Sequence, residues 1–202
     1  MNLRYLGDAL DHWKGSLFES LQNANVLANF AVDPMCTDPE AWQSSDFSFY
    51  ARLLHIRAEQ IVRHEHTLRE RKAYFTEIKH QGDLFLDPDT GISTSATNSQ
   101  YLRPREIGEL LERVFERILV IYQHVRAQKC AIRIDNVISA VESRIDRFRW
   151  CSYESPTVAM LFMSRSSRIH EVVDHFKTIL GKHAETRIRG SHLIDIASSA
   201  SV

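Results

Sequence analysis

The fold is decided by the stretch GDLFLDPDTGI, residues 82–92. Its apolar run, Leu84 to Leu86, is too short and too close to glycine and proline for a helix, so it predicts the end of a buried strand. Pro88 fixes φ and lacks an amide donor, so the strand cannot continue through it. Asp87 is therefore expected at the carboxyl end of the strand, with Asp89 in the turn that follows. This edge holds the ligand crevice in open α/β sheets, so both carboxylates are candidate site residues.

Two carboxylates at such an edge suit a proton acceptor, a pair of divalent-metal ligands or a cap on the next helix. The structural alternative is that Asp89 only completes an Asx-type turn with Thr90 and Gly91. Asp87 needs no such turn role, which favours a functional site.

Composition predicts one α/β domain over residues 1–196, with a helical insertion or lid at 47–80 and a flexible tail at 197–202. The chain has 202 residues, of which 44% are hydrophobic, enough to bury an ordinary core. Its formal charge of −1 gives no global argument for a nucleic-acid, membrane or acidic partner.

Cysteine usage and charge placement predict a reduced, cytoplasmic protein without a membrane partner. The three cysteines are too few and too scattered for a disulfide framework or a zinc site. Charged residues interrupt the first apolar pattern, which excludes a signal peptide, and no apolar run approaches the length of a transmembrane span.

The order of expected elements predicts a Rossmann-like three-layer α/β sandwich. Helices are expected near residues 8–21, 47–80, 103–117, 132–145 and 165–180, and strands near 26–35, 82–87, 118–125, 148–153 and 158–164, with an edge strand within 184–196. Alternating strands and helices indicate a mostly parallel sheet, closed by a C-terminal antiparallel hairpin and a final helix.

Polar groups follow several of these strands and are expected to converge on one crevice. Tyr122, His124 and Arg126 replace apolar residues at the end of the 118–125 strand, and Arg165 follows the hairpin. His124 suits a general base and the arginines suit phosphate clamps. A satisfied core histidine is the alternative for His124.

Asp8, Asp11 and Lys14 fall at three-residue intervals on the first helix, with Asp8 as its N-cap. They share one helix side, so they either join the crevice or form an exposed ladder of ion pairs. In the functional interpretation Lys14 is catalytic, together with Asp87, Asp89 and His124. The substrate-binding set is then Asp8, Asp11, Tyr122, Arg126 and Arg165.

Three motifs resemble those of a bacterial protein family without an assigned activity. They are GDALDHWK at 7–14, DPDTG at 87–91 and YQHVR at 122–126. The family pattern has a Tyr-Phe-Gly-Asp-like start, an Asp-Pro-Asp-Asn-Gly turn and a Tyr-Gln-His motif, so Thr90 departs from it. The resemblance spans nearly the whole chain and implies no particular reaction.

A more distant resemblance is to class I methyltransferases that modify adenine N6 in ribosomal RNA. Those enzymes share a Gly-[Asn/Asp]-x-x-Asp-x-x-Lys helix, matched by Gly7, Asp8, Asp11 and Lys14, and also end in a hairpin and a closing helix. Their Asp-Pro-Pro-Tyr turn corresponds to residues 87–90, where Asp89 and Thr90 replace proline and the tyrosine that stacks on the flipped base. Their glycine-rich cofactor loop corresponds to residues 33–37, which contain no glycine.

These features favour a metal-dependent nuclease or phosphodiesterase that uses Mg²⁺ or Mn²⁺, held by Asp87 and Asp89. The alternatives are a methyltransferase that uses S-adenosylmethionine, and a degenerate nucleotide sensor or complex subunit. All three imply a nucleic-acid or nucleotide partner, and a homo-oligomer or larger complex is compatible with each. The family type also suggests a phage-defence module, although no residue carries that suggestion.

Overall fold

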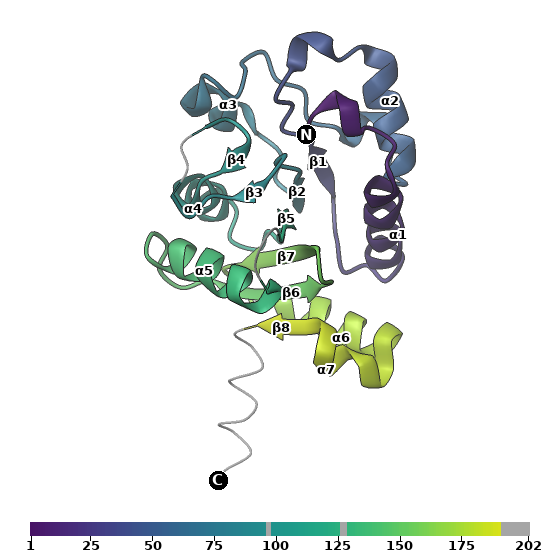
Figure 1. Cartoon of the computed structure of the whole chain (residues 1–202), viewed down its shortest axis with the longest axis vertical. Coiled ribbons are helices and arrows are strands. Elements are labelled where there is room, and N and C mark those ends of the chain that lie inside the picture. The colour runs from purple at the N-terminus through teal and green to yellow at the C-terminus, as the bar shows by residue number, and fades with distance from the viewer. Residues whose placement is uncertain (96–97, 126–128, 191–202) are drawn as a thin grey trace.

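A six-stranded sheet with helices on both faces forms the body of the protein, as seen in a computed structural model that describes residues 1–95, 98–125 and 129–190 (Figure 1). The strands of this sheet are β1 (Ala31–Asp33), β2 (Leu84–Leu86), β5 (Leu119–His124), β6 (Arg149–Glu154), β7 (Val158–Ser164) and β8 (Ile188–Gly190). Two short strands, β3 (Gly91–Ile92) and β4 (Tyr101–Leu102), form a separate parallel pair.

The described α-helices lie before or between these strands along the chain, singly or two in succession. They are α1 (Ala9–Asn23), α2 (Ser44–Leu53), α3 (Arg71–Glu77), α4 (Pro104–Arg113), α5 (Cys130–Glu142), α6 (Ile169–Leu180) and α7 (Ala184–Arg187). Four 3₁₀ turns, η1 (Leu3–Tyr5), η2 (Pro39–Ala41), η3 (Ala58–Gln60) and η4 (Gly181–His183), complete the described elements.

The sheet is parallel in its first half and antiparallel in its second. Its strand order is β1-β2-β5-β7-β6-β8, with parallel pairing from β1 to β5 and antiparallel pairing from β5 to β8. The predicted C-terminal hairpin and edge strand are confirmed. The expectation of a mostly parallel sheet holds only for the first three strands, because β7, the second hairpin strand, pairs with β5 and reverses the direction there.

Alternating side chains divide the apolar interior into two cores, one on each face of the sheet. Phe85 of β2 joins the core formed with α1, α2, α6 and α7. Its neighbours Leu84 and Leu86 join the core formed with α3, α4 and α5. This division follows from the two-residue period of a strand, and it explains why β2 is apolar at every position.

The predicted helical segment at 47–80 is wrong over its central part. Only α2 and α3 are α-helical there, and the irregular segment 61–70 begins beside β1. The Val62 amide donates to the Val32 carbonyl at 2.8 Å, and Ile61 forms an isolated parallel bridge with Val32. Pairing with the strand thus replaces the helical hydrogen bonds that the apolar spacing suggested.

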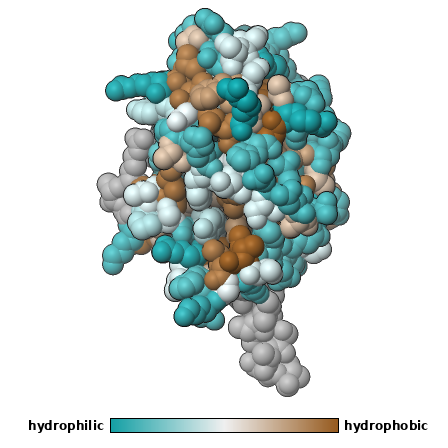
Figure 2. Space-filling model, turned by 90° about the vertical axis from the view of Figure 1, so that its right-hand side faces the viewer, coloured by the Kyte–Doolittle hydropathy of each residue, from teal (hydrophilic) through white to brown (hydrophobic). Residues whose placement is uncertain are grey.

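The surface carries hydrophobic residues in patches among hydrophilic ones, as seen on the face that Figure 2 presents. Among the residues that the structure describes, the exposed large hydrophobic side chains are those of Tyr5, Phe49, Phe115, Ile132 and Ile179. Within the described ranges, no helix is both long and apolar enough to cross a membrane.

Candidate functional site

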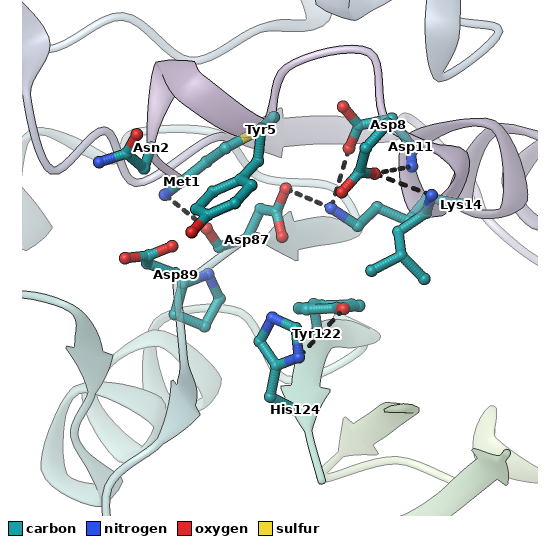
Figure 3. A pocket seen from close by; sticks show the side chains of 12 residues that line it. Met1, Asn2, Tyr5, Asp8, Asp11, Lys14, Asp87, Asp89, Tyr122 and His124 are labelled. Carbon is teal, nitrogen blue, oxygen red and sulfur yellow. Dashed lines mark hydrogen bonds and ion pairs between the residues drawn. The ribbon is translucent and has the colours of Figure 1, made fainter. Parts of the chain in front are cut away.

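A pocket of about 170 Å³ lies where the carboxyl ends of β2 and β5 meet the start of α1 (Figure 3). It is lined by Met1, Asn2, Tyr5, Asp8, Leu10, Asp11, Lys14, Asp87, Pro88, Asp89, Tyr122 and His124. The structure therefore brings together seven of the nine predicted site residues, from three segments far apart in sequence.

Asp87 lies at the floor of the pocket, where its carboxylate is buried and fully engaged on one oxygen. Its Oδ2 accepts hydrogen bonds from Lys14 Nζ at 2.7 Å and from the Tyr50 hydroxyl at 2.5 Å. The side chain of Asp87 is only 3% exposed. Pro88 ends β2 at this point, as the sequence predicts, so the carboxylate is held at the edge of the sheet.

Lys14 joins two segments of the chain because it pairs with Asp11 as well as with Asp87. Its Nζ is 3.1 Å from Asp11 Oδ1 and lies 4.5 Å from the centre of the Tyr122 ring. Both side chains of the Asp11–Lys14 pair are 5% exposed or less, so the exposed ladder considered from the sequence is wrong.

Electrostatics keeps this lysine protonated. Burial lowers the pKa of Lys14, but the attraction of Asp87 and Asp11 outweighs burial, and the pKa is raised overall. Burial also raises the pKa of Asp11, although Lys14 opposes that shift. An ammonium group has no lone pair, so Lys14 supplies charge and position and not a base.

The start of α1 explains how two of the acidic residues reach the pocket. Asp8 Oδ1 caps the helix by accepting from the amides of Leu10 at 2.8 Å and Asp11 at 3.2 Å, as the sequence predicts. Asp11 Oδ2 accepts from the amide of Gly7 at 2.9 Å. These bonds fix both carboxylates at the amino end of a helix, where the helix dipole favours negative charge.

Tyr50 is a site residue that the sequence analysis missed. It lies in the apolar spacing of α2 and is fully buried, which is the pattern of a core residue. Burial, and then the nearby Asp87 carboxylate, raises the pKa of Tyr50 well above its ordinary value, so the phenol stays protonated and donates. Only the long-range contact with Asp87 identifies its role, and no local motif signals that contact.

Gln123 is a second missed residue, and it joins two of the sequence motifs. Its Oε1 accepts from the Ile92 amide at 2.8 Å, and its Nε2 donates to the His124 carbonyl at 2.7 Å. A Cβ atom on Gly91, where φ is +104°, would lie 2.5 Å from this amide. Glycine is therefore required in the 87–91 turn by both its φ value and its contact with Gln123.

His124 ends β5 and lies beside Tyr122 at the pocket wall. The Tyr122 hydroxyl is 3.5 Å from His124 Nδ1, and the two rings meet edge to face at 4.9 Å. Asp89 faces the same space from the turn after β2, and no hydrogen bond or ion pair of its carboxylate is seen within the described ranges. Asp89 and His124 are thus the groups best placed to meet a ligand.

Arg165, one of the two arginines that were predicted to bind phosphate, does not line this pocket. Arg165 follows β7, which runs antiparallel to β5, so it lies beyond the opposite edge of the sheet near the start of β5. The prediction that Arg165 lies at the same edge of the sheet as Asp87 and His124 is therefore wrong. Arg126 lies outside the residues that the structure describes.

A resident divalent cation does not fit the Asp87–Asp89 pair as arranged. The Lys14 ammonium and the Tyr50 hydroxyl already bind Oδ2 of Asp87, and the ammonium repels a cation beside this carboxylate. Within residues 1–95, 98–125 and 129–190, no group of three or more His, Cys, Asp or Glu side chains is arranged to hold a metal.

The loop after β1 is also poorly suited to bind S-adenosylmethionine. Pro34, Met35 and Cys36 are buried, and the carbonyls of Pro34 and Met35 accept hydrogen bonds from the Met1 nitrogen at 2.7 and 2.6 Å. These two carbonyls are therefore occupied in the loop that corresponds to the glycine-rich cofactor loop.

Comparisons of the chain with known protein families, with curated proteins and with solved structures find no match.

Proposed function

We propose that the chain acts on a nucleotide or a nucleic acid, on a Rossmann-like scaffold, and that its acidic pocket receives the amine-bearing edge of a nucleobase. The position of the pocket supports this proposal, because ligands of open α/β sheets bind outside the carboxyl ends of the parallel strands. The distant resemblance of the helix start and of the Asp-Pro turn to enzymes that modify adenine N6 is consistent with it.

The acidic lining is the observation that carries the proposal. Four aspartates line the pocket and outnumber its ammonium groups, of which Lys14 is already paired. Ionised carboxylates only accept hydrogen bonds, so they favour a ligand with N–H donors, such as adenine or cytosine. A phosphate group is repelled by the same lining and is therefore placed outside the pocket.

The volume supports the same ligand class. About 170 Å³ is close to the ~150 Å³ of a cavity that holds one benzene ring, so the pocket can receive one edge of a base and is too small to enclose a whole nucleotide. Tyr5 is exposed and offers an aromatic face at the lining, which suits a planar heterocycle.

We assign the chemistry to Asp89 and His124 rather than to the pocket floor. The Asp89 carboxylate accepts a hydrogen bond from the amine of the nucleobase. His124 donates a proton to the nucleobase or accepts one from it, for which an imidazole is suited near neutral pH. The Asp87–Lys14–Tyr50 network positions the floor of the pocket, since Lys14 and Tyr50 both bind Oδ2 of Asp87.

A metal-dependent phosphodiesterase is the second candidate, and the open carboxylate of Asp89 favours it. A hydrated Mg²⁺ or Mn²⁺ keeps several waters and needs only one or two carboxylates. Such an ion would arrive with the phosphates of the substrate and would offset the negative charge of the carboxylates. Methyl transfer from S-adenosylmethionine and binding without turnover are the remaining outcomes of the tests below.

A thermal-shift panel tests the proposal with adenosine, cytidine, S-adenosylmethionine, Mg²⁺ and Mn²⁺, each added to the wild-type chain. We expect adenosine or cytidine to stabilise the protein without metal, and Asp89→Asn to weaken that binding about tenfold. Asp174→Asn is the matched control, since Asp174 is an exposed residue of α6 outside the pocket lining.

Each other response points to a different function. Stabilisation by Mg²⁺ or Mn²⁺ alone, together with metal-dependent cleavage of DNA or RNA, would replace the proposal with the phosphodiesterase. A response to S-adenosylmethionine alone would favour the methyltransferase. Nucleoside binding with no change to the ligand over time would identify a sensor.

A further inference from the structure

A second pocket, of about 240 Å³, opens at the carboxyl end of β1 and shares no lining residue with the first. It is lined by Pro34, Cys36, Pro39, Phe47, Val62, Arg63, His64, His66, Thr67 and Tyr74. The irregular segment 61–70, which the sequence analysis expected to be helical, supplies half of this lining.

The walls of this second pocket are mostly aromatic and apolar. The His64 ring stacks on the Tyr74 ring with centroids 3.7 Å apart and planes 15° apart. Phe47 faces the same space from α2, and prolines from the loops after β1 complete the lining. Flat walls of this kind suit a planar ring, which gains both hydrophobic burial and ring contacts there.

The second pocket has two side chains at its rim that can carry positive charge, Arg63 and His66. Arg63 places its guanidinium 3.7 Å from the centre of the Phe47 ring and remains exposed at the rim. His66 Nδ1 binds Glu77, and no partner of its Nε2 is seen among the described residues, so this nitrogen is available to a ligand. Both Arg63 and His66 can donate charge-assisted hydrogen bonds to an anion.

A continuous chain of hydrogen bonds holds these imidazoles in place. The Tyr74 hydroxyl donates to Asp33 Oδ1 at 2.6 Å, and Asp33 Oδ2 lies 3.1 Å from His64 Nε2. Glu77 then bridges the two histidines through His64 Nδ1, at 3.2 Å, and His66 Nδ1. Because each histidine has a carboxylate partner, both rings are oriented and the protonated form of each is favoured.

We propose that this second pocket binds a small planar ring that carries a carboxylate or phosphate group. The ring lies against Phe47 and Tyr74, and the anionic group meets Arg63 and His66 Nε2 at the rim. The two pockets then have opposite preferences, since the first selects donors and the second selects an anion. The inference does not depend on the function proposed for the first pocket, because the lining residues differ.

Binding, rather than covalent chemistry, is the role assigned to this pocket. Cys36 is its only sulfur-bearing lining residue, and burial raises the pKa of the Cys36 thiol to about 12. The thiolate is therefore negligible near neutral pH, and the thiol acts as part of the apolar wall.

Benzoate, phenyl phosphate and the neutral isostere benzamide test the proposal by titration into the ¹⁵N- and ¹³C-labelled wild-type chain. We expect benzoate or phenyl phosphate to shift the ring resonances of His66 and Phe47 saturably, with benzamide at least about tenfold weaker. The two anions distinguish a carboxylate ligand from a phosphate ligand. Arg63→Gln and His66→Gln should each weaken binding of the anion about tenfold, while His183→Gln, an exposed control on η4, should not.

Benzamide binding as tightly as benzoate would overturn the assignment of an anion. Shifts confined to residues around Asp89 would move the anion to the first pocket and refute the inference. No saturable shift with any of the three probes would also refute it. Because Arg63 is exposed and His66 is partly exposed, their variants are expected to fold, and unchanged amide spectra verify that before titration.

Discussion

Replacing Lys14 by Met tests whether the buried network is a structural unit. The substitution keeps an unbranched side chain but removes the ammonium that neutralises Asp11 and Asp87. Their side chains are 1% and 3% exposed, so both charges lose their partner away from water. Removing one partner of a buried ion pair costs about 3–5 kcal/mol, whereas an exposed pair contributes about 0–1 kcal/mol.

Urea denaturation followed by circular dichroism measures the change in unfolding free energy. For a chain of this size, a loss of about 3–5 kcal/mol corresponds to a melting temperature lower by about 6–20 °C. The m-value should stay constant, because the surface exposed on unfolding does not change. The double variant Lys14→Met/Asp87→Asn should recover part of the loss, since a neutral amide is less costly to bury than an unpaired carboxylate.

Lys177→Met provides the matched control for this measurement. Lys177 also pairs with an aspartate three residues earlier on a helix, but the pair is 3.8 Å apart and its side chains are 46% and 74% exposed. The control should lose less than about 1 kcal/mol. A loss in Lys14→Met no larger than that of the control would refute the buried network.

Two further perturbations probe the turn and the histidine cluster. Gly91→Ala should lower the unfolding free energy by about 1–3 kcal/mol, since the new methyl group meets Gln123 at 2.5 Å and φ is positive, and an unchanged urea midpoint would contradict this. For His64, burial lowers the pKa, but hydrogen bonds to Asp33 and Glu77 outweigh it and raise the pKa above 6.5. The wild-type chain should therefore have a higher unfolding free energy than His64→Gln below about pH 6.5. This difference should disappear as the pH rises through the raised pKa of His64. A difference in urea midpoint between wild type and His64→Gln that grows from pH 6 to pH 8 would rule out this assignment.

The sheet and its site edge were predictable where local chemistry dominates. Apolar runs that end at proline or at polar residues identified β2 and β5, and the cap at Asp8 identified α1. Each of these signals depends on neighbours within a few residues. They were sufficient to place Asp87 and His124 at one pocket.

The remaining features depend on contacts between distant segments, which one sequence does not reveal. Arg165 was misplaced because the direction of β7 is set by its pairing with β5, and a following helix looks the same for either direction. Tyr50 fits the apolar spacing of α2, so only its contact with Asp87 distinguishes it from a core residue. The segment 61–70 has helix-compatible spacing, but its pairing with Val32 prevails over helical hydrogen bonds.

The engaged state of Asp87 changes the order of the functional hypotheses. From the sequence, Asp87 and Asp89 were expected as neighbouring carboxylates at the sheet edge and therefore suited a metal. In the folded chain, Lys14 and Tyr50 occupy an oxygen of Asp87, which leaves Asp89 as the open acceptor. The function then rests on what this acidic pocket binds.

Calorimetric titration of the wild-type chain with adenosine and with purine riboside, in buffer without divalent metal, tests the central claim most directly. The two nucleosides differ only at position 6 of the base, where adenosine has an amine donor and purine riboside has a hydrogen atom. We expect adenosine to bind and purine riboside to bind at least about tenfold more weakly, because it offers no amine to the carboxylates, which can only accept. Equal affinities, or no binding of either nucleoside, would contradict recognition of an amine by this pocket.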